Sequence, residues 1–219
     1  MTNIPYTKCL SLTGYEPEDL IALTGVYAIH PEAEFLDWLN RGLINYWIVY
    51  NDQNELSVII QSPEVAGVTI IEELTVIIKS ATEIYNAVFV LYPTARNSNG
   101  NYGFKRLNEE IKNGISLGFD KITLWAYGNY SLLKDWSGYL IWGKYGFLMY
   151  KPDEISVFDN QMSEDKLQHC TNINHVVLTK EGTAYWKHTG WDWHGEFHLK
   201  TSSPSRRIFK AYGVEKGLI

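Results

Sequence analysis

The segment 85–128 constrains the fold most, because it holds two strand-like runs with one helix-like run between them. The first run, YNAVFVLYP at 85–93, is continuously apolar, as expected of a central strand buried on both faces, and Pro93 ends it. The second run is DKITLWAYG at 120–128. Two strands joined by a helix over about 40 residues form a βαβ unit, so we expect them to lie side by side and parallel, with a right-handed crossover.

The run between these strands has the apolar spacing of a helix, at Phe104, Leu107, Ile111, Ile115 and Leu117. Five charged residues fall between these positions, and we expect them to face water: Lys105, Arg106, Glu109, Glu110 and Lys112. Gly118 follows the last apolar position and is placed to cap the C-terminus of the helix.

The N-terminal part is expected to hold two helices and a β-hairpin. The helices are predicted over 16–24, where Pro17 stands in the first turn, and over 31–43. The hairpin joins INYWIVY at 44–50 to ELSVIIQ at 55–61. The next segment, 65–84, can be a strand or a buried helix, and we favour a strand.

The C-terminal part is expected to hold a short helix over 131–141, the strand-like KYGFLMY at 144–150, and strands near 174–179 and 189–200. The last strand alternates: the apolar positions Trp191, Trp193, Phe197 and Leu199 point one way and the polar positions between them point the other. A final helix is predicted with Ser202 or Ser203 as N-cap, Pro204 in its first turn and Gly213 as its stop.

These elements predict an α/β fold with a mixed, centrally parallel and antiparallel twisted sheet flanked by helices. We expect one domain, with a core over 1–160 and a C-terminal extension over 161–219 packed on it. Aromatic residues are 14% of the chain, and an aromatic core is the favoured explanation over a cleft lined by rings.

Charge and cysteine content limit the classes of function and the compartment. The net charge of -6 argues against general binding to nucleic acid or to anionic membranes. Cys9 and Cys170 are far apart and form no disulfide framework, and no signal peptide or membrane span is evident. We therefore expect a cytoplasmic protein.

The stretch ARNSNGNYGFKRL at 95–107 places one arginine and two glycines at the start of the predicted helix. Free N–H groups and the positive end of the dipole make a helix N-terminus suited to an anion, and glycine lets a phosphate approach the backbone. The stretch matches neither a P-loop nor a dinucleotide-binding motif. An Asn/Gly-rich surface turn explains the same composition, so both readings stay open.

The order of a strand ending before Pro93, an arginine, a glycine loop, a helix, LGFDKITLWA and GYLIWGKYGF resembles the core of the GNAT superfamily of N-acyltransferases over residues 44–150. The segment SGYLIWGKYGF and the Trp-rich tail are similar to a divergent GNAT-like branch met in bacterial and phage proteins. The resemblance implies a GNAT-like fold that takes acetyl-CoA or another coenzyme A thioester as acyl donor and modifies an amine.

The resemblance also implies which residues hold coenzyme A. Arg96 and the backbone near the glycines would bind the pyrophosphate, and the backbone at Leu91 and Tyr92 would polarise the acyl carbonyl. Each gap is one residue longer here than in the family's Arg-x-x-Gly-x-Gly pattern. The further residues assigned to coenzyme binding are Asn99, Gly100, Asn101, Gly103 and Asn129.

Acyl transfer to an amine needs a base for the amine and a proton for the leaving sulfur. By the resemblance, Glu72 or Glu73 is the base, and at most one of two adjacent strand residues can face the cleft. The position of the family's acidic tyrosine is Trp142, which cannot donate a useful proton. Tyr139 and Tyr145 are the candidate substitutes.

The tail contains His188, His194 and His198 with Asp192 and Glu196. On one strand face His194 and His198 would be about 13 Å apart, too far to share an ion, so no metal site is expected. Cys170 with His169 or His175 is a possible nucleophile pair that nothing nearby supports.

The sequence is therefore compatible with three functions. The leading one is an acyl-CoA-dependent N-acyltransferase whose partners are a coenzyme A thioester and an amine of unknown identity. The alternatives are a GNAT-shaped binding protein without turnover and, with less support, a metal-dependent hydrolase. The sequence predicts no membrane or nucleic-acid partner and leaves a homodimer open.

Overall fold

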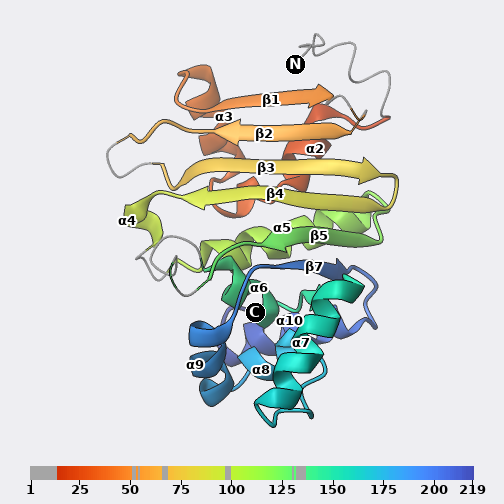
Figure 1. Cartoon of the computed structure of the whole chain (residues 1–219). Coiled ribbons are helices and arrows are strands. Elements are labelled where there is room, and N and C mark those ends of the chain that lie inside the picture. Colours follow the sequence, from red (N-terminus) through yellow and green to blue (C-terminus); the bar gives the residue numbers. More distant parts are fainter. Residues whose placement is uncertain are drawn as a thin grey trace. The chain divides into compact units, whose positions relative to one another are not determined.

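A computed structural model describes residues 14–50, 53, 55–65, 69–96, 100–129, 131 and 137–219. The chain forms two compact units, Met1–Asp120 and Lys121–Ile219 (Figure 1). Each unit combines β-strands with helices, which confirms the predicted α/β class. The expected parallel pairing of 85–92 with 120–128 would join strands of different units, and it stays a prediction, as does the division after residue 160.

In the described part of the first unit the strands lie in sequence order: β1 (Asn45–Tyr50), β2 (Leu56–Gln61), β3 (Ile71–Ser80) and β4 (Glu83–Leu91) (Figure 1). All three pairings among them are antiparallel. These segments are rich in β-branched and aromatic residues, which fit a pleated, half-buried surface. The predicted hairpin and the strand favoured for the ambiguous segment are both confirmed.

Helices α2 (Pro17–Leu23) and α3 (Glu32–Asn40), with the 3-10 turn η1 (Val26–Ala28) between them, lie behind these strands in Figure 1. Leu20 of α2 packs in one cluster with Ile48, Leu56 and Val58 of β1 and β2. Both predicted N-terminal helices are confirmed. Pro17 occupies the first turn of α2, where its missing N–H costs no hydrogen bond.

Helix α5 (Tyr102–Ser116) follows the short helix α4 (Pro93–Arg96) and ends as predicted. Gly118 has a φ of 85°, its N–H donates to Ile115, and the N–H of Phe119 donates to Gly114. This pair of bonds is a Schellman motif, and it satisfies the last carbonyls of the helix.

Two charged residues of α5 do not face water, contrary to the prediction. Arg106 and Glu110 are 0% exposed, whereas Ile115, predicted on the apolar face, is 44% exposed. The reason is that the flank of α5 next to η1 and β4 offers polar partners, the carbonyl of Thr24 and the side chain of Asn86.

Strand β4 is less buried than its continuous apolar run predicted. Only Ile84 and Asn86 are buried, and its other residues are half-buried. A bulge contributes to this difference, because Thr75 pairs with Val88 while Val76 pairs with Asn86. The extra residue, Ala87, breaks the alternation of faces along the strand.

The second unit contains β5 (Lys121–Ala126), β7 (Trp193–His198) and β6 (Leu148–Met149), adjacent in that order and antiparallel. In β7 every second residue is buried, from Trp193 to Phe197, so the predicted alternation is confirmed. The strand-like run at 144–150 contributes only the two residues of β6.

The helices that the structure describes beside these strands are α6 (Gly138–Lys144), α7 (Pro152–Glu164), α8 (Ile173–Val177), α9 (Lys180–Thr189) and α10 (Pro204–Glu215) (Figure 1). Helices α7 and α9 were not predicted. The expected helix over 131–141 begins later, at Gly138, and residues 130 and 132–136 lie outside the described residues.

The strand predicted near 174–179 is wrong, because this segment forms α8. Asn174 buries its amide and donates to the carbonyls of Gly143 at 2.5 Å and Phe147 at 3.1 Å. Val176 and Val177 are buried beside it. Tertiary hydrogen bonds of one buried asparagine thus override a β-branched run.

Helix α10 starts as predicted and ends later. Ser203 accepts the N–H of Arg206 as the N-cap, and Pro204 follows in the first turn. Gly213 does not stop the helix, which continues to Glu215; Gly217, with a φ of 64°, follows its end.

An aromatic core fills the second unit, as predicted. The carbonyl of Tyr139 accepts the indole N–H of Trp186 at 3.2 Å and that of Trp193 at 2.9 Å. Phe147 and Phe197 are fully buried against each other, with ring centroids 5.4 Å apart. Buried indoles need such partners for their N–H groups.

No helix within the described parts of the chain has both the length and the apolar character needed to cross a membrane.

Candidate functional site

The candidate base Glu72 lies in a β-bulge at the start of β3. Ile71 pairs with Leu91 and Glu73 pairs with Val90, so Glu72 is the extra residue between two successive pairs. Its carbonyl accepts the N–H of Ser62 at 3.3 Å, and its side chain is exposed. A bulge interrupts strict alternation, so the rule that adjacent residues face opposite sides does not decide between Glu72 and Glu73.

Glu73 is half-buried and already has a neighbour in its own strand. The hydroxyl of Thr75 lies 3.4 Å from its carboxylate, two residues along β3. Between the two candidates, Glu72 is therefore the more accessible carboxylate. The assignment of either as a base stays a prediction.

Leu91 and Tyr92 stand where β4 ends, opposite the bulge. The N–H of Tyr92 donates to the carbonyl of Ile70 at 3.0 Å, and its buried hydroxyl donates to the carbonyl of Ser62. Burial, together with Glu72 and Glu64, raises the pKa of Tyr92. The bond from the N–H of Tyr92 to Ile70 holds the end of β4 against β3. For this N–H to polarise an acyl carbonyl, the bond to Ile70 would have to break.

Arg96 closes the single turn of α4 directly after β4. Its Nε donates to the carbonyl of Leu91 at 2.7 Å, and its backbone N–H donates to Tyr92 at 3.0 Å. This bond ties the guanidinium group to the end of β4, on an exposed residue. A guanidinium group is chemically suited to a phosphate oxygen.

Helix α5 begins at Tyr102, and five residues separate it from Arg96. Asn99 was assigned to coenzyme binding and lies outside the described residues, which resume at Gly100. Four peptide units separate Arg96 from Gly100, so their Cα atoms are at most about 14 Å apart. Arg96 and Gly100 are therefore held within one short stretch of the chain.

The first turn of α5 leaves backbone donors without helical acceptors. Asn101, the N-cap, has a φ of 51°, and among the described residues its side chain accepts no capping bond. The first intrahelical bond runs from the N–H of Lys105 to the carbonyl of Asn101 at 3.0 Å. The N–H groups of Tyr102 and Gly103 precede it, so no carbonyl of the helix accepts them.

A structural role also explains one of the two glycines. A Cβ atom on Gly100 would lie 2.3 Å from the ring of Tyr102, which packs close to Gly100. Lys105 Nζ lies 5.8 Å from the centre of the same ring. Tyr102 and Lys105 were not assigned to the site from the sequence, although their places in the first turn of α5 were the available signal.

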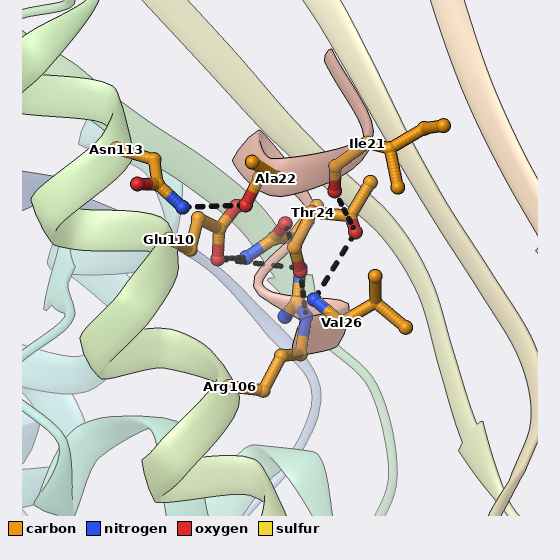
Figure 2. A network of polar contacts seen from close by, with 8 residues as sticks. Ile21, Ala22, Thr24, Val26, Arg106, Glu110 and Asn113 are labelled. Atoms are coloured by element: carbon orange, nitrogen blue, oxygen red, sulfur yellow. Dashed lines mark hydrogen bonds and ion pairs between the residues drawn. The ribbon is translucent and has the colours of Figure 1, made fainter. Parts of the chain in front are cut away.

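A buried polar network joins α5 to the loop after α2 and to β4, within the first unit (Figure 2). Arg106 donates from Nε to the carbonyl of Thr24 at 2.9 Å and from Nη2 to the side-chain oxygen of Asn86 at 2.7 Å. Glu110 lies 3.2 Å from Nη2 of Arg106 and accepts from Asn86 at 2.9 Å. Asn113 adds a bond to the carbonyl of Ala22 at 2.6 Å.

Tyr139, a candidate acid, is a core residue of the second unit. It is 0% exposed, and its hydroxyl donates to the carbonyl of Lys187 at 3.0 Å. Burial raises the pKa of Tyr139. A hydroxyl bound in this way holds α6 to α9, so acid catalysis by Tyr139 would need a local opening.

Tyr145, the other candidate acid, is also buried. Its ring packs edge-on against Trp142 and Tyr212, at centroid distances of 5.9 and 5.3 Å. Burial, and then the neighbouring Tyr212, raises the pKa of Tyr145 well above its usual value. A phenol of raised pKa is a weaker proton donor, although it stays protonated at neutral pH.

Asn129, assigned to coenzyme binding, lies in the loop after β5. Its side-chain oxygen accepts the N–H of Ser131 at 3.0 Å and the hydroxyl at 2.5 Å. This is a local side-chain turn. Asn129, Tyr139 and Tyr145 belong to the second unit, and their assigned roles stay predictions.

The structure thus brings Glu72, Leu91, Tyr92 and Arg96 together at one end of the β3–β4 pair. The tail histidines do not gather: within the described residues no three His, Cys, Asp or Glu side chains are grouped to hold a metal ion. His198 instead contacts Glu196 at 3.0 Å on its own strand.

Comparisons with known proteins do not identify a family for this chain. No protein-family description matches the chain, and no curated protein matches it. Among solved structures, an acetyltransferase from Streptococcus agalactiae aligns with a TM-score of 0.34 and 15% identity, over 64% of this chain and 82% of that chain. A superposition this loose assigns neither a fold family nor a function, so the case for function depends on the residues themselves.

Proposed function

We propose that the protein is a GNAT-like acyltransferase that moves an acyl group from a coenzyme A thioester to an amine. The observation that carries the proposal is the succession, within one unit, of the end of β4, Arg96 and the first turn of α5. Arg96 and the N–H groups of Tyr102 and Gly103 are the donors that a pyrophosphate needs.

The reaction joins the amine nitrogen to the carbonyl carbon of the thioester and breaks the carbon–sulfur bond. The amine must be neutral to attack, so a base removes one proton from its ammonium form. After attack the nitrogen loses a second proton, and an acid gives one proton to the sulfur as it leaves, so that an amide and a free thiol result. Glu72, exposed at the β3 bulge, is the candidate base of the first unit. Tyr139 and Tyr145 are the candidates to supply a proton.

Calorimetric titration with acetyl-CoA tests the proposal. We expect saturable binding that Arg96→Ala weakens at least about tenfold, because charge-assisted hydrogen bonds contribute about 1.5–3 kcal/mol. The control is Arg41→Ala, which removes another exposed arginine of the first unit, paired with Asp37 at 3.2 Å. Absence of heat at millimolar acetyl-CoA, or equal losses in both variants, would overturn the proposal.

A second function, a GNAT-shaped binding protein without turnover, is favoured by one observation. Both candidate acids are built into the core, and Trp142 stands where the family has its acidic tyrosine. This alternative predicts that acetyl-CoA binds but that no free thiol is released with any amine. Thiol release that depends on both acetyl-CoA and an amine would exclude it.

A further inference from the structure

Four residues of the second unit form a polar and aromatic cluster, and none of them has a role in the function proposed above. Trp125 of β5 lies opposite His194 of β7 in the antiparallel register, and Asp192 stands two residues before His194. Glu154 comes from the first turn of α7. We call this set the Trp125 cluster.

Glu154 holds the ring of His194 in one orientation. One carboxylate oxygen accepts the backbone N–H of His194 at 2.8 Å, and the other lies 2.6 Å from the ring Nδ1. An ionised carboxylate only accepts hydrogen bonds, so Nδ1 carries the hydrogen. In the neutral ring Nε2 is then the acceptor, and among the described residues it has no polar partner.

Trp125 joins Asp192 to His194. Its indole N–H donates to Asp192 at 2.8 Å, and its ring is stacked on that of His194 at a centroid distance of 6.0 Å and an interplanar angle of 9°. Tyr127 packs edge-on against the same indole at 4.8 Å. Trp125 is nevertheless 43% exposed, so this surface is open to a ligand.

The cluster carries negative charge that no lysine or arginine neutralises within the described residues. Among the residues that the structure describes, Asp192 bonds the indole alone and Glu154 bonds His194 alone. By contrast, Glu196 on the same strand has Lys121 at 3.8 Å. A site with two carboxylates, one imidazole acceptor and an exposed indole is complementary to a cation that donates hydrogen bonds.

We propose that the Trp125 cluster binds the primary ammonium group of an amine substrate, with Asp192 and Nε2 of His194 accepting its N–H groups. Trp125 contacts the cation and the adjoining carbon chain. This inference deepens the proposed acyl transfer, on which the identity of the ligand as a substrate rests. It also names a second candidate base, in the second unit, besides Glu72.

The proton step balances within the cluster. An N–H bond of the ammonium group breaks, an Nε2–H bond forms on His194, and the nitrogen keeps the electron pair as a neutral amine. The positive charge passes to the imidazole ring, next to the Glu154 carboxylate. In this step Glu154 positions the ring, and His194 touches the substrate.

Nuclear magnetic resonance of the full chain tests the site with 1,4-diaminobutane as the probe and no coenzyme A present. We expect saturable shifts of the Trp125 indole N–H and the His194 ring signals, with millimolar affinity, as for a ligand of few heavy atoms. Uncharged 1,4-butanediol should cause no such shifts. Tetramethylammonium, which has no N–H groups, should bind more weakly than the diamine.

Asp192→Asn is the sharpest variant, because the amide oxygen can still accept from Trp125 while the charge is lost. We expect it to weaken diamine binding at least about tenfold. His194→Gln should weaken binding as well, and the matched control His198→Gln, on the same face of β7, should not. Spectra of each variant without ligand show whether the fold is kept.

The inference is overturned if the diamine shifts neither signal, if tetramethylammonium binds equally well, or if His198→Gln weakens binding as much as Asp192→Asn. Because this test contains no coenzyme A, its failure leaves acetyl-CoA binding at Arg96 untouched. Failure of acetyl-CoA to bind would likewise leave an ammonium site at the Trp125 cluster.

Discussion

Arg106 and Glu110 show best how single residues shape the first unit. Their charges are fully buried, and burial lowers the pKa of Arg106 and raises that of Glu110, while each charge opposes the shift of the other. Among the described residues, Nη1 of Arg106 and Oε1 of Glu110 have no hydrogen-bond partner. Such a pair adds little net stability and is costly to break from one side.

Arg106→Met is therefore expected to lower the free energy of unfolding by about 3–5 kcal/mol, because it leaves Glu110 buried without a counter-charge. The double variant Arg106→Met/Glu110→Leu should lose less than the single one. Urea denaturation measures both. The control is Lys112→Met, which breaks the exposed pair with Glu109 on the same helix and should cost less than about 1 kcal/mol.

An equal loss for Arg106→Met and Lys112→Met would contradict the buried charge pair.

His30 makes the stability of the first unit depend on pH. It is buried against Trp38, with ring centroids 4.7 Å apart, and burial lowers its pKa from 6.5 to about 4. Above pH 6.5 the ring is neutral in both states, so its contribution is complete. Between pH 6.5 and 4 only the unfolded chain takes up the proton, so stability falls as the pH falls.

The loss should reach roughly 3 kcal/mol by pH 4. His30→Phe keeps a ring beside Trp38 and removes the titration. Denaturation of both proteins at several pH values gives the difference directly: the gap should change with pH only in this window. If the free energy of unfolding of His30→Phe fell with pH as steeply as that of the wild type, His30 would not be the source of the pH dependence.

At the scale of elements, the turn before η1 and the end of α5 use glycine for different reasons. Gly118 has a φ of 85° and open space where a Cβ would stand, whereas Gly25 has a φ of 73° and a Cβ there would lie 2.2 Å from the carbonyl of Arg106. Gly118 is therefore required only by its left-handed backbone conformation. Gly25 also lets η1 approach α5 closely.

Gly118→Ala is accordingly expected to cost about 1–2 kcal/mol through left-handed backbone strain alone. Gly25→Ala should cost about 1–3 kcal/mol more, because overpacking adds to the same strain. Thermal and urea unfolding of the two variants compare them. If the two variants lost the same free energy of unfolding, η1 and α5 could move apart without loss, and this would contradict their close packing at Gly25.

Local pattern was enough to predict most elements of the first unit. The caps at Pro17 and Gly118, the hairpin and the spacing of α5 each depend on neighbours in sequence. The prediction was wrong where long-range partners decide: Asn174 turns a β-branched segment into α8, and Thr24 and Asn86 draw the charges of α5 inward. No periodicity shows such partners.

For the whole molecule, the places of the proposed site residues in the fold were predictable in part. The sequence predicted that Arg96 lies between a strand and a helix, because the order of strand, loop and helix is local. The burial of Tyr139 and Tyr145 was not foreseeable, since it depends on α9 and α10, which supply Lys187 and Tyr212. The Trp125 cluster joins β5, α7 and β7, which are far apart in sequence, and only its histidine and aspartate drew attention beforehand.

A crystal structure of the protein with coenzyme A would show whether coenzyme A binds at Arg96 and the N-terminus of α5. We expect the pyrophosphate oxygens to accept the N–H groups of Tyr102 and Gly103, with the guanidinium of Arg96 beside them. Coenzyme A bound elsewhere, with this helix N-terminus facing only water, would contradict this expectation.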